Sequence, residues 1–203
     1  MKSRVAYLSI TLLLLSAAGC KTLLPPSQYV KWIESADHGL KQEHEVNGVQ
    51  FDLQYKPADY IIACENGKHE LPETFHASRK EKLGELFYFS LALKSGTQDL
   101  LMHNLNNDQE YYQRVNYYSL DFQQDIKMVV GTDTLPCLMY QFENTYGVAP
   151  YIKMSLAFSG KKRPEILQKD FTILVNDRVF GGGWLRFPFA HQDLNAIPEI
   201  KLN

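Results

Sequence analysis

Histidine is a common metal ligand, and the chain has six histidines, four of them in its first half. None of these four is followed by a second histidine four residues later, the spacing that places two ligands on one face of a helix. After His69 the sequence continues to Pro72, and a proline interrupts the helix that such a site needs. We therefore interpret the histidines as surface residues and predict no metal site. The four are His38, His44, His69 and His76.

A second candidate is the polar run from Asn104 to Asp108, whose side-chain oxygens alternate like the start of a calcium loop. A calcium loop has glycine at its sixth place and glutamate at its twelfth, and here these are Gln109 and Val115. The run is better interpreted as a loop in which Asn107 or Asp108 caps a helix that continues through 113–118.

The three glycines of 181–183 raise the possibility of a phosphate cradle. Such a cradle requires a helix directly after the glycines, whereas Leu185, Arg186 and Phe187 alternate like a strand. We therefore predict a turn or bulge between two strands, with Trp184 at the edge of the β core.

Evidence for catalysis is weak. The chain has no Gly-x-Ser-x-Gly nucleophile motif, and no motif implies a cofactor. Asp121, Asp125 and Glu143 are carboxylates that the fold could bring together, as in a glycan hydrolase, but their spacing in the sequence does not show their separation. Enzymatic activity is thus unsupported rather than excluded.

Paired aromatic residues are the remaining feature that points to binding. Adjacent tyrosines cannot all point inward from one helix face, so some are expected at the surface, where Tyr and Trp recognise sugars or proteins. The alternative is that the rings pack beneath loops. The candidate contact residues are Tyr111, Tyr112, Tyr117, Tyr118 and Trp184.

The first twenty residues carry a targeting pattern. Lys2 and Arg4 form a basic start, an apolar run of about a dozen residues follows, and small residues then lead to Cys20. The apolar run is too short to span a bilayer as a helix. This stretch resembles the lipobox of bacterial lipoproteins, with Ala17 where the family prefers leucine. An ordinary secretory signal is the alternative.

The lipoprotein resemblance implies a cut between Gly19 and Cys20, with residues 1–19 removed and Cys20 carrying the acyl chains, palmitate among them. Lys21 rather than Asp after the cysteine implies sorting to the outer membrane, and the absence of acids after Lys21 favours the periplasmic face. Residues 20–28, with Pro25-Pro26, are predicted to be a short tether. The expected partners are the membrane, through the anchor, and an unknown envelope protein or glycan.

Charge argues against nucleic acid as a partner. Without the leader the chain keeps 19 basic and 23 acidic residues, because only Lys2 and Arg4 are lost with it.

The cysteines argue for a disulfide: if Cys20 carries lipid, Cys64 and Cys137 remain as a pair that an oxidising envelope can join.

Period-two alternation of apolar residues dominates the chain, which has 203 residues, 45% of them hydrophobic. Strands are predicted over 49–55, 86–94, 120–130 (interrupted), 138–142, 152–158, 171–175, 179–180 and 185–189. Short helices are predicted over 29–40, 57–64, 74–83 and 113–118. The pattern favours a single mainly β domain over 29–203, an antiparallel β-sandwich for which an immunoglobulin-like topology is one candidate, with an α+β sheet as the alternative.

These observations lead to three functional hypotheses. The first is a non-catalytic binding or structural module held at the outer membrane. The second is a carbohydrate-binding lipoprotein that uses exposed aromatic rings, and the third is a glycan or cell-wall hydrolase. A planar cluster of exposed rings would favour the second, and two carboxylates facing each other across a cleft would favour the third.

Overall fold

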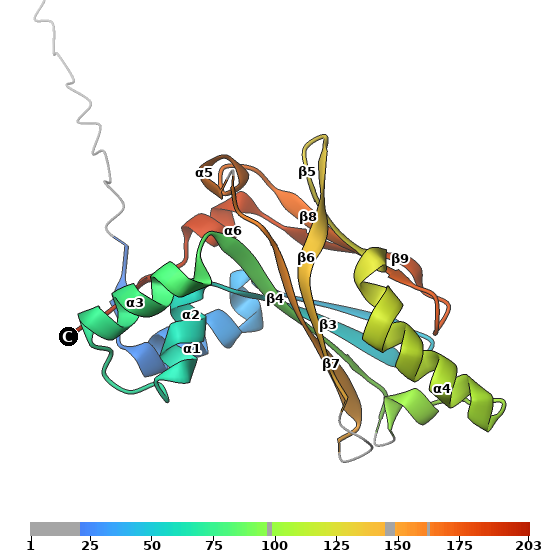
Figure 1. Cartoon of the computed structure of the whole chain (residues 1–203). Helices are drawn as coiled ribbons and strands as arrows, with labels where there is room; N and C mark the ends of the chain where they lie inside the picture. The colour runs from blue at the N-terminus through green and yellow to red at the C-terminus, as the bar shows by residue number, and fades with distance from the viewer. Residues whose placement is uncertain (1–20, 97–98, 145–148, 162) are drawn as a thin grey trace, which may run out of the picture.

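The structure, a computed structural model, describes residues 21–96, 99–144, 149–161 and 163–203 and consists mainly of antiparallel β-sheet (Figure 1). Eight strands of the described chain form one sheet in the order β2-β3-β4-β7-β6-β5-β8-β9. They are β2 (Lys41–Val46), β3 (Val49–Lys56), β4 (Leu86–Lys94), β5 (Ile126–Val130), β6 (Asp133–Glu143), β7 (Tyr151–Ser159), β8 (Phe171–Asp177) and β9 (Gly183–Phe189).

The sheet curls until its first strands face its last, so that it is nearly barrel-shaped. Phe89 of β4 packs beside Phe158 of the neighbouring β7, with ring centroids 5.8 Å apart. The same ring also contacts Phe189 of β9 at 5.4 Å, although β9 lies five places away in the sheet. Buried aromatic and aliphatic side chains from β3, β4, β5, β7, β8 and β9 therefore fill the interior and form one core.

Side chains join the two edges of the sheet. His44 of β2 donates a hydrogen bond from Nε2 to the backbone carbonyl of Arg186 in β9 at 2.8 Å, and its ring packs edge-on against Phe187. Asn47, in the turn after β2, donates from Nδ2 to the carbonyl of Phe180 at 2.7 Å. The near-barrel is thus closed by side chains at this seam, while the other strand pairs are joined by backbone ladders.

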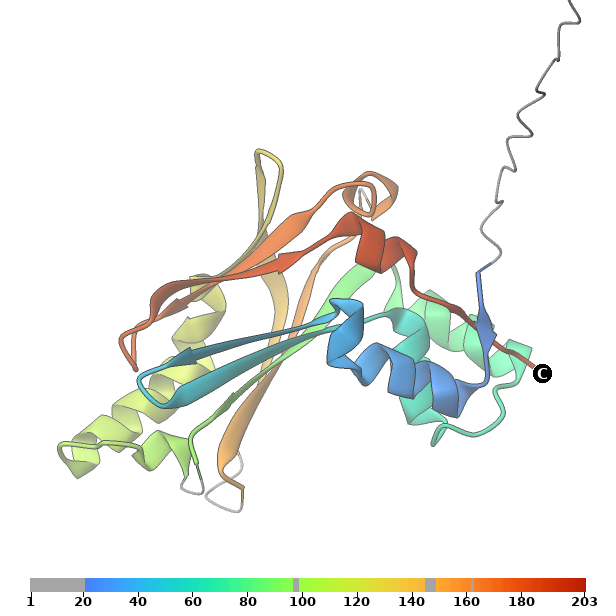
Figure 2. The same ribbon diagram turned by 180° about the vertical axis from the view of Figure 1, so that it is seen from behind.

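The longer helices lie at two opposite ends of the sheet (Figures 1 and 2). At one end are α1 (Pro26–Glu34), α2 (Ala58–Glu65) and α3 (Glu73–Leu83), beside a small parallel pair formed by β1 (Leu23–Leu24) and β10 (Glu199–Ile200). At the other end is α4 (Asp108–Asn116). Of two short helices, α5 (Arg163–Ile166) precedes β8 and α6 (His191–Asn195) follows β9.

The segment predicted to be a tether is part of the folded domain from residue 21 onward. The carbonyls of Thr22 and Leu24 accept hydrogen bonds from Glu199 and Lys201, at 2.9 and 2.8 Å. Pro26 then begins α1, because proline has no backbone N–H to lose in the first turn of a helix. The prediction of a free linker over 20–28 is therefore wrong for its described residues.

The prediction of a mainly antiparallel β fold with short helices is confirmed, whereas a sandwich or immunoglobulin-like topology is not. The expected strand over 120–130 is half wrong. Residues 117–125 form a π turn and a 3-10 turn, and only Ile126–Val130 is a strand. Strand β2 was not predicted at all. Within the described residues, no helix is long and apolar enough to cross a bilayer.

Candidate functional site

The helix α4 begins where the loop before it predicts a cap. Asn107 accepts a hydrogen bond at its side-chain oxygen from the backbone N–H of Glu110, at 3.1 Å, which satisfies one of the free donors of the first turn. Glu110 in turn accepts from the backbone and side-chain nitrogens of Asn106, both at 2.9 Å. This reciprocal arrangement confirms the helix-cap interpretation of the polar run and fixes the carboxylate of Glu110.

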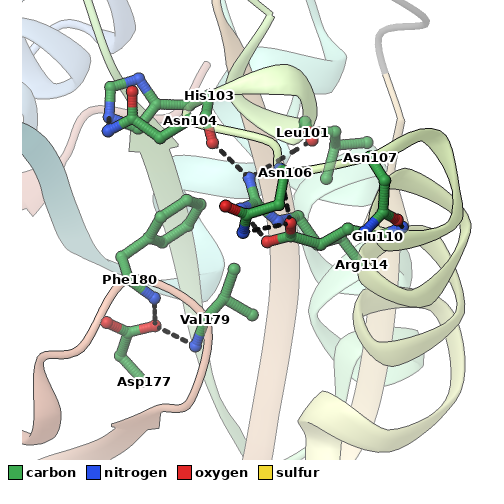
Figure 3. Close-up of polar contacts among 10 residues, drawn as sticks. All are labelled: Leu101, His103, Asn104, Asn106, Asn107, Glu110, Arg114, Asp177, Val179 and Phe180. Carbon is green, nitrogen blue, oxygen red and sulfur yellow. Dashed lines mark hydrogen bonds and ion pairs between the residues drawn. The ribbon is translucent and has the colours of Figure 1, made fainter.

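Arg114 is a buried cation one turn further along α4, with a side chain 6% exposed (Figure 3). Its guanidinium donates to Glu110 Oε1 at 2.6 Å and to the carbonyl of His103 at 2.6 Å. It also lies over the ring of Phe180, 5.3 Å from the centroid. Arg114 thus joins α4 to the loop before it and to the β8–β9 turn, while its Nε is a buried donor that has no partner among the described residues.

The contacts of Glu110 keep it ionised. Hydrogen bonds from the backbone of Asn106, from Arg114 and from the Asn106 side chain lower the pKa of Glu110 to about 2. The charge of Arg114 is therefore paired at any pH near neutrality, and the lone pairs of Glu110 are largely taken up within the protein.

The β8–β9 turn is organised by Asp177, which is 5% exposed. Its Oδ1 accepts from the backbone N–H groups of Val179 and Phe180, at 2.9 and 3.0 Å (Figure 3). Its Oδ2 accepts from the backbone N–H of Gly182 at 2.7 Å. A carboxylate of the protein therefore already occupies the position that a phosphate would take among these amides. The predicted turn at the glycines is confirmed, but the strand predicted over 179–180 is wrong, because β8 ends at Asp177 and these two residues belong to the turn. The turn fixes the position of Arg178.

Asp125 is the second buried carboxylate of this region, with a side chain 4% exposed. It accepts from the hydroxyl of Tyr117 at 2.8 Å, from Asn176 Nδ2 at 3.2 Å and from Arg178 Nη2 at 2.5 Å. Burial and the bond to Asp125 raise the pKa of Tyr117, so its hydroxyl remains a donor. Asp125 thus holds one edge of the Arg178 guanidinium, while the side chain of Arg178 remains 62% exposed.

These groups line an open cleft of about 480 Å³ between α4, the turns that follow it and the β8–β9 turn. Its polar residues differ in what they still offer to a ligand. The carboxylates of Glu110 and Asp125 are engaged, whereas Asp121, Gln113 and Gln124 have no side-chain hydrogen bond within the described part of the chain. The cleft is lined by Glu110, Gln113, Arg114, Tyr117, Asp121, Gln124, Asp125, Arg178 and Val179.

The predicted aromatic contact residues do not come together as a flat platform. Tyr118 is 1% exposed and belongs to the core, so its prediction as a ligand contact is wrong. Tyr117 lines the cleft, but its ring packs against Tyr118 and Phe122. Tyr111 is half-buried beside the exposed ring of Tyr112, at 5.5 Å.

Trp184 lies apart from these tyrosines, at the start of the edge strand β9, as predicted. Its ring is 51% exposed, and the ammonium group of Lys127 lies 5.5 Å from the ring centroid. Of the five predicted aromatics, only Tyr117 lines the cleft.

The predicted disulfide is absent, because Cys64 and Cys137 are both free thiols. Cys64 is half-buried in α2, at the helical end of the domain, whereas Cys137 lies in β6 and donates from its thiol to the carbonyl of Met139. Burial raises the pKa of Cys137 to about 11. Gly19 and Cys20, the predicted cleavage and lipidation positions, lie outside the described residues.

One histidine differs from its interpretation as a surface residue. His76 is 9% exposed and its Nε2 lies 2.8 Å from Asp59 Oδ1, which Lys80 also contacts at 3.0 Å. The other three predicted histidines are partly or largely exposed. In the described residues no group of three or more His, Cys, Asp or Glu side chains is placed to hold a metal ion.

Asp121 and Asp125, predicted as possible partners, both line the cleft, whereas Glu143 lies elsewhere, beside Lys153 and Ser155. Arg114 and Arg178 were not predicted from the sequence. The four-residue spacing of Glu110 and Arg114, which predicts a pair on one helix face, was a signal that could have found the first. Arg178 had no such signal, because its partner Asp125 is 53 residues away.

Comparisons with known proteins do not extend this description to a function. No protein-family model matches the chain, and no curated protein matches it. A solved structure of a protein of unknown function from Burkholderia pseudomallei is similar with a TM-score of 0.38 and 12% sequence identity, over 86% of this chain and 93% of that chain. Similarity at this level assigns no family.

Proposed function

We propose that the protein is a bacterial envelope lipoprotein, anchored to the periplasmic face of the outer membrane through Cys20, whose folded domain is a non-catalytic binding module. The anchor rests on the basic start, the short apolar run and the small residues before Cys20. The binding role rests on one observation: a polar cleft whose walls are joined by two ion pairs, each with one buried partner, and in which other donors and acceptors have no partner in the described chain.

The position of the cleft supports this proposal. The described chain begins at the end of the domain that holds α1, α3 and β1, whereas α4 and its cleft lie at the opposite end (Figures 1 and 2). An anchor at residue 20 would therefore place the cleft on the side of the domain that faces away from the membrane, open to soluble envelope components.

The contacts in the cleft favour binding over hydrolysis. A glycan hydrolase needs two carboxyl groups free to act on the substrate, one as an acid and the other as a base or nucleophile. The carboxylate oxygens of Glu110 and Asp125 already accept hydrogen bonds from protein donors. Among the lining residues, Asp121 is the one carboxylate without such a bond in the described chain. Carbohydrate binding on a flat aromatic surface is also less favoured, because the Tyr117 ring is packed on other rings.

Fractionation tests the anchor. The full-length protein should incorporate labelled palmitate and remain in the membrane fraction after a high-salt wash, whereas Cys20→Ser should carry no label and become soluble. Cys64→Ser is the matched control and should behave like the unmodified protein. A Cys20→Ser protein that stays with the membrane after the wash would show that the anchor is assigned wrongly.

Site-specific crosslinking tests the binding role. A photoreactive benzophenone residue in place of Gln124, which lines the cleft, should give a discrete adduct in intact cells. The same residue in place of the exposed Lys31 in α1 is the control. The adduct from position 124 should be lost when Arg178→Gln is added. Equal adducts from both positions, or an adduct from position 124 that is unaffected by Arg178→Gln, would contradict a binding role for this cleft.

A further inference from the structure

The charged donors of the cleft belong to its two arginines, whereas Gln113 and Gln124 offer neutral amide groups. Arg178 has one Nη2 contact, to Asp125, and its other N–H groups have no hydrogen bond to the described residues. Arg114 lines the same cleft, is 6% exposed and keeps Nε without a partner in the described chain. The Arg114 Nε is buried, so the N–H groups of the exposed Arg178 are the charged donors that a ligand oxygen can reach.

The orientation of Arg178 is fixed before any ligand arrives. Asp177 holds the backbone of the turn from Val179 to Gly182, and Asp125 holds one edge of the guanidinium. Asp125 is held in turn by the hydroxyl of Tyr117. An arginine that is oriented in this way presents its remaining N–H groups as a planar fork, which matches the two oxygens of a carboxylate.

The negative charge in the cleft limits what the fork can accept. The lining residues carry two arginines and three carboxylates, so the site is net negative by one charge when all are ionised. A phosphate with two charges would be repelled by Asp121 and Asp125 more strongly than a carboxylate with one. Asp121 itself is an acceptor without a donor in the described chain, and it would pair with an amino or hydroxyl group of the same ligand.

We infer that the cleft binds a small molecule that carries both a carboxylate and a hydrogen-bond donor, with Arg178 receiving the carboxylate and Asp121 receiving the amino or hydroxyl group. This inference rests on the proposed binding function and names its ligand class. The same chemistry occurs at the two charged ends of an amino acid or short peptide and in a sugar acid. Asp125 and Tyr117 are positioning residues, because both oxygens of Asp125 and the hydroxyl proton of Tyr117 are already in the hydrogen bonds that orient Arg178.

Two matched pairs of probes distinguish the ligand class and its source. Alanyl-alanine is compared with its C-terminal amide, and galacturonate with galactose, so that each pair differs in the carboxylate. Calorimetry on the full-length lipidated protein in detergent should show that at least one acid binds about tenfold or more tightly than its neutral partner. Inorganic phosphate should bind more weakly than that acid. If neither acid is preferred, or if phosphate binds as tightly, the inference is wrong.

Variants then assign the contacts. Arg178→Lys keeps the charge but loses the fork, and should weaken binding of the preferred acid by about tenfold or more. Asp125→Asn should weaken it by a smaller factor. Arg186→Lys, at an exposed arginine of β9 outside the cleft, should leave the Kd unchanged. An unchanged Kd for Arg178→Lys would overturn the assignment.

The role of Asp121 has its own readout. Asp121→Asn should weaken binding of the dipeptide more than binding of galacturonate, because an ammonium group loses an ion pair whereas a hydroxyl group can still donate to an amide oxygen. Equal binding by the variant and the unmodified protein would remove Asp121 from the site. If none of the tested acids binds but the crosslink from position 124 still forms, the ligand class is wrong and the binding function is retained. Loss of that crosslink together with all ligand binding would reject both.

Discussion

His44 in β2 donates a hydrogen bond to the backbone carbonyl of Arg186 in β9, across 142 residues of sequence and between the two edges of the sheet. Edge strands expose unpaired N–H and C=O groups that invite pairing with other chains. Here one of these carbonyls is satisfied by a histidine side chain, and Asn47 satisfies the carbonyl of Phe180 in the same way. The seam therefore stabilises the near-barrel at the place where no backbone ladder between described strands does so.

Removing a seam contact should lower the stability of the domain. We expect His44→Ala and Asn47→Ala each to reduce the free energy of unfolding by about 1 kcal/mol, because each leaves a carbonyl without its donor. Glu45→Ala, at an exposed position between them, is the control and should change stability by less than about 0.5 kcal/mol. Urea denaturation of the three variants measures this. If Glu45→Ala is as costly as the other two, the seam has no special role.

Asp177 should be the most sensitive residue of the β8–β9 turn. Asp177→Ala leaves three backbone N–H groups without their acceptor, and we expect a loss of about 3 kcal/mol or more in the free energy of unfolding. Asp177→Asn keeps an oxygen for Val179 and Phe180 and loses the acceptor of Gly182, so it should cost roughly 1 kcal/mol. Thermal and urea unfolding would reveal this order, and equal losses for the two variants would contradict it.

Glu110 should contribute stability that depends on pH. Its pKa is about 2 in the folded protein, below the ordinary value of 4.5, so the folded state binds this proton less readily than the unfolded state does. The contribution is therefore fully present above pH 4.5 and is lost as the pH falls toward 2.

The corresponding experiment compares Glu110→Gln with the unmodified protein. The variant should be less stable at pH 6, and the difference should shrink progressively between about pH 4.5 and pH 2. Glu45→Gln, at an exposed glutamate of β2 outside the cleft, serves as the control. A stability difference for Glu110→Gln that stays constant down to pH 3 would show that the carboxylate is not held in this way.

The two thiols give a prediction that corrects the sequence analysis. Denatured without reductant, a Cys20→Ser chain, in which the variants below are also made, should show two reactive thiols, Cys64 and Cys137, because neither forms a disulfide. In the folded protein at neutral pH, Cys137 should resist modification, since it is buried and its pKa is about 11. Native labelling with Ellman's reagent should therefore be lost in Cys64→Ser and kept in Cys137→Ser. If the denatured protein shows no reactive thiol before reduction, Cys64 and Cys137 do form a disulfide.

The sequence predicts those elements whose two faces meet different surroundings. Strand β4 alternates cleanly because Phe87, Phe89 and Leu91 face the core, and its predicted bounds match the structure. Strand β2 lacks that signal, since it is a half-exposed edge built from Lys41, Gln42, Glu43 and their neighbours. Apolar periodicity reports burial, and an edge strand with little burial leaves almost no trace of it.

Other misjudged elements depend on contacts far apart in the sequence. Leu120 and Phe122 suggested an extended strand, but the chain forms a π turn there, which exposes Leu120 and buries Phe122. The cleft has the same origin, because Arg178 reaches its site only when β8 lies beside β5 and its preceding turn, which carries Asp125. Pairing of cysteines likewise depends on a distance in space, which composition does not contain.

The proposed anchor at Cys20 predicts how the domain is oriented on a membrane. Leu23, in β1, is 55% exposed and lies at the α1–α3 end, whereas Tyr112, in α4, is 67% exposed and lies at the opposite end (Figures 1 and 2). Because residues 22–24 pair with β10 rather than forming a free linker, an anchor at Cys20 should hold the first end close to the bilayer.

A fluorescent probe attached to Leu23→Cys or Tyr112→Cys, in chains without Cys64 and Cys137, measures this orientation in vesicles that contain spin-labelled lipid. We expect strong quenching at position 23 and little at position 112, since the quencher acts over short distances and the two positions lie at opposite ends of the domain. The Leu23→Cys probe on a chain that also carries Cys20→Ser is the control and should not be quenched. Equal quenching at both positions would mean that the domain lies along the membrane, with its cleft beside the lipid.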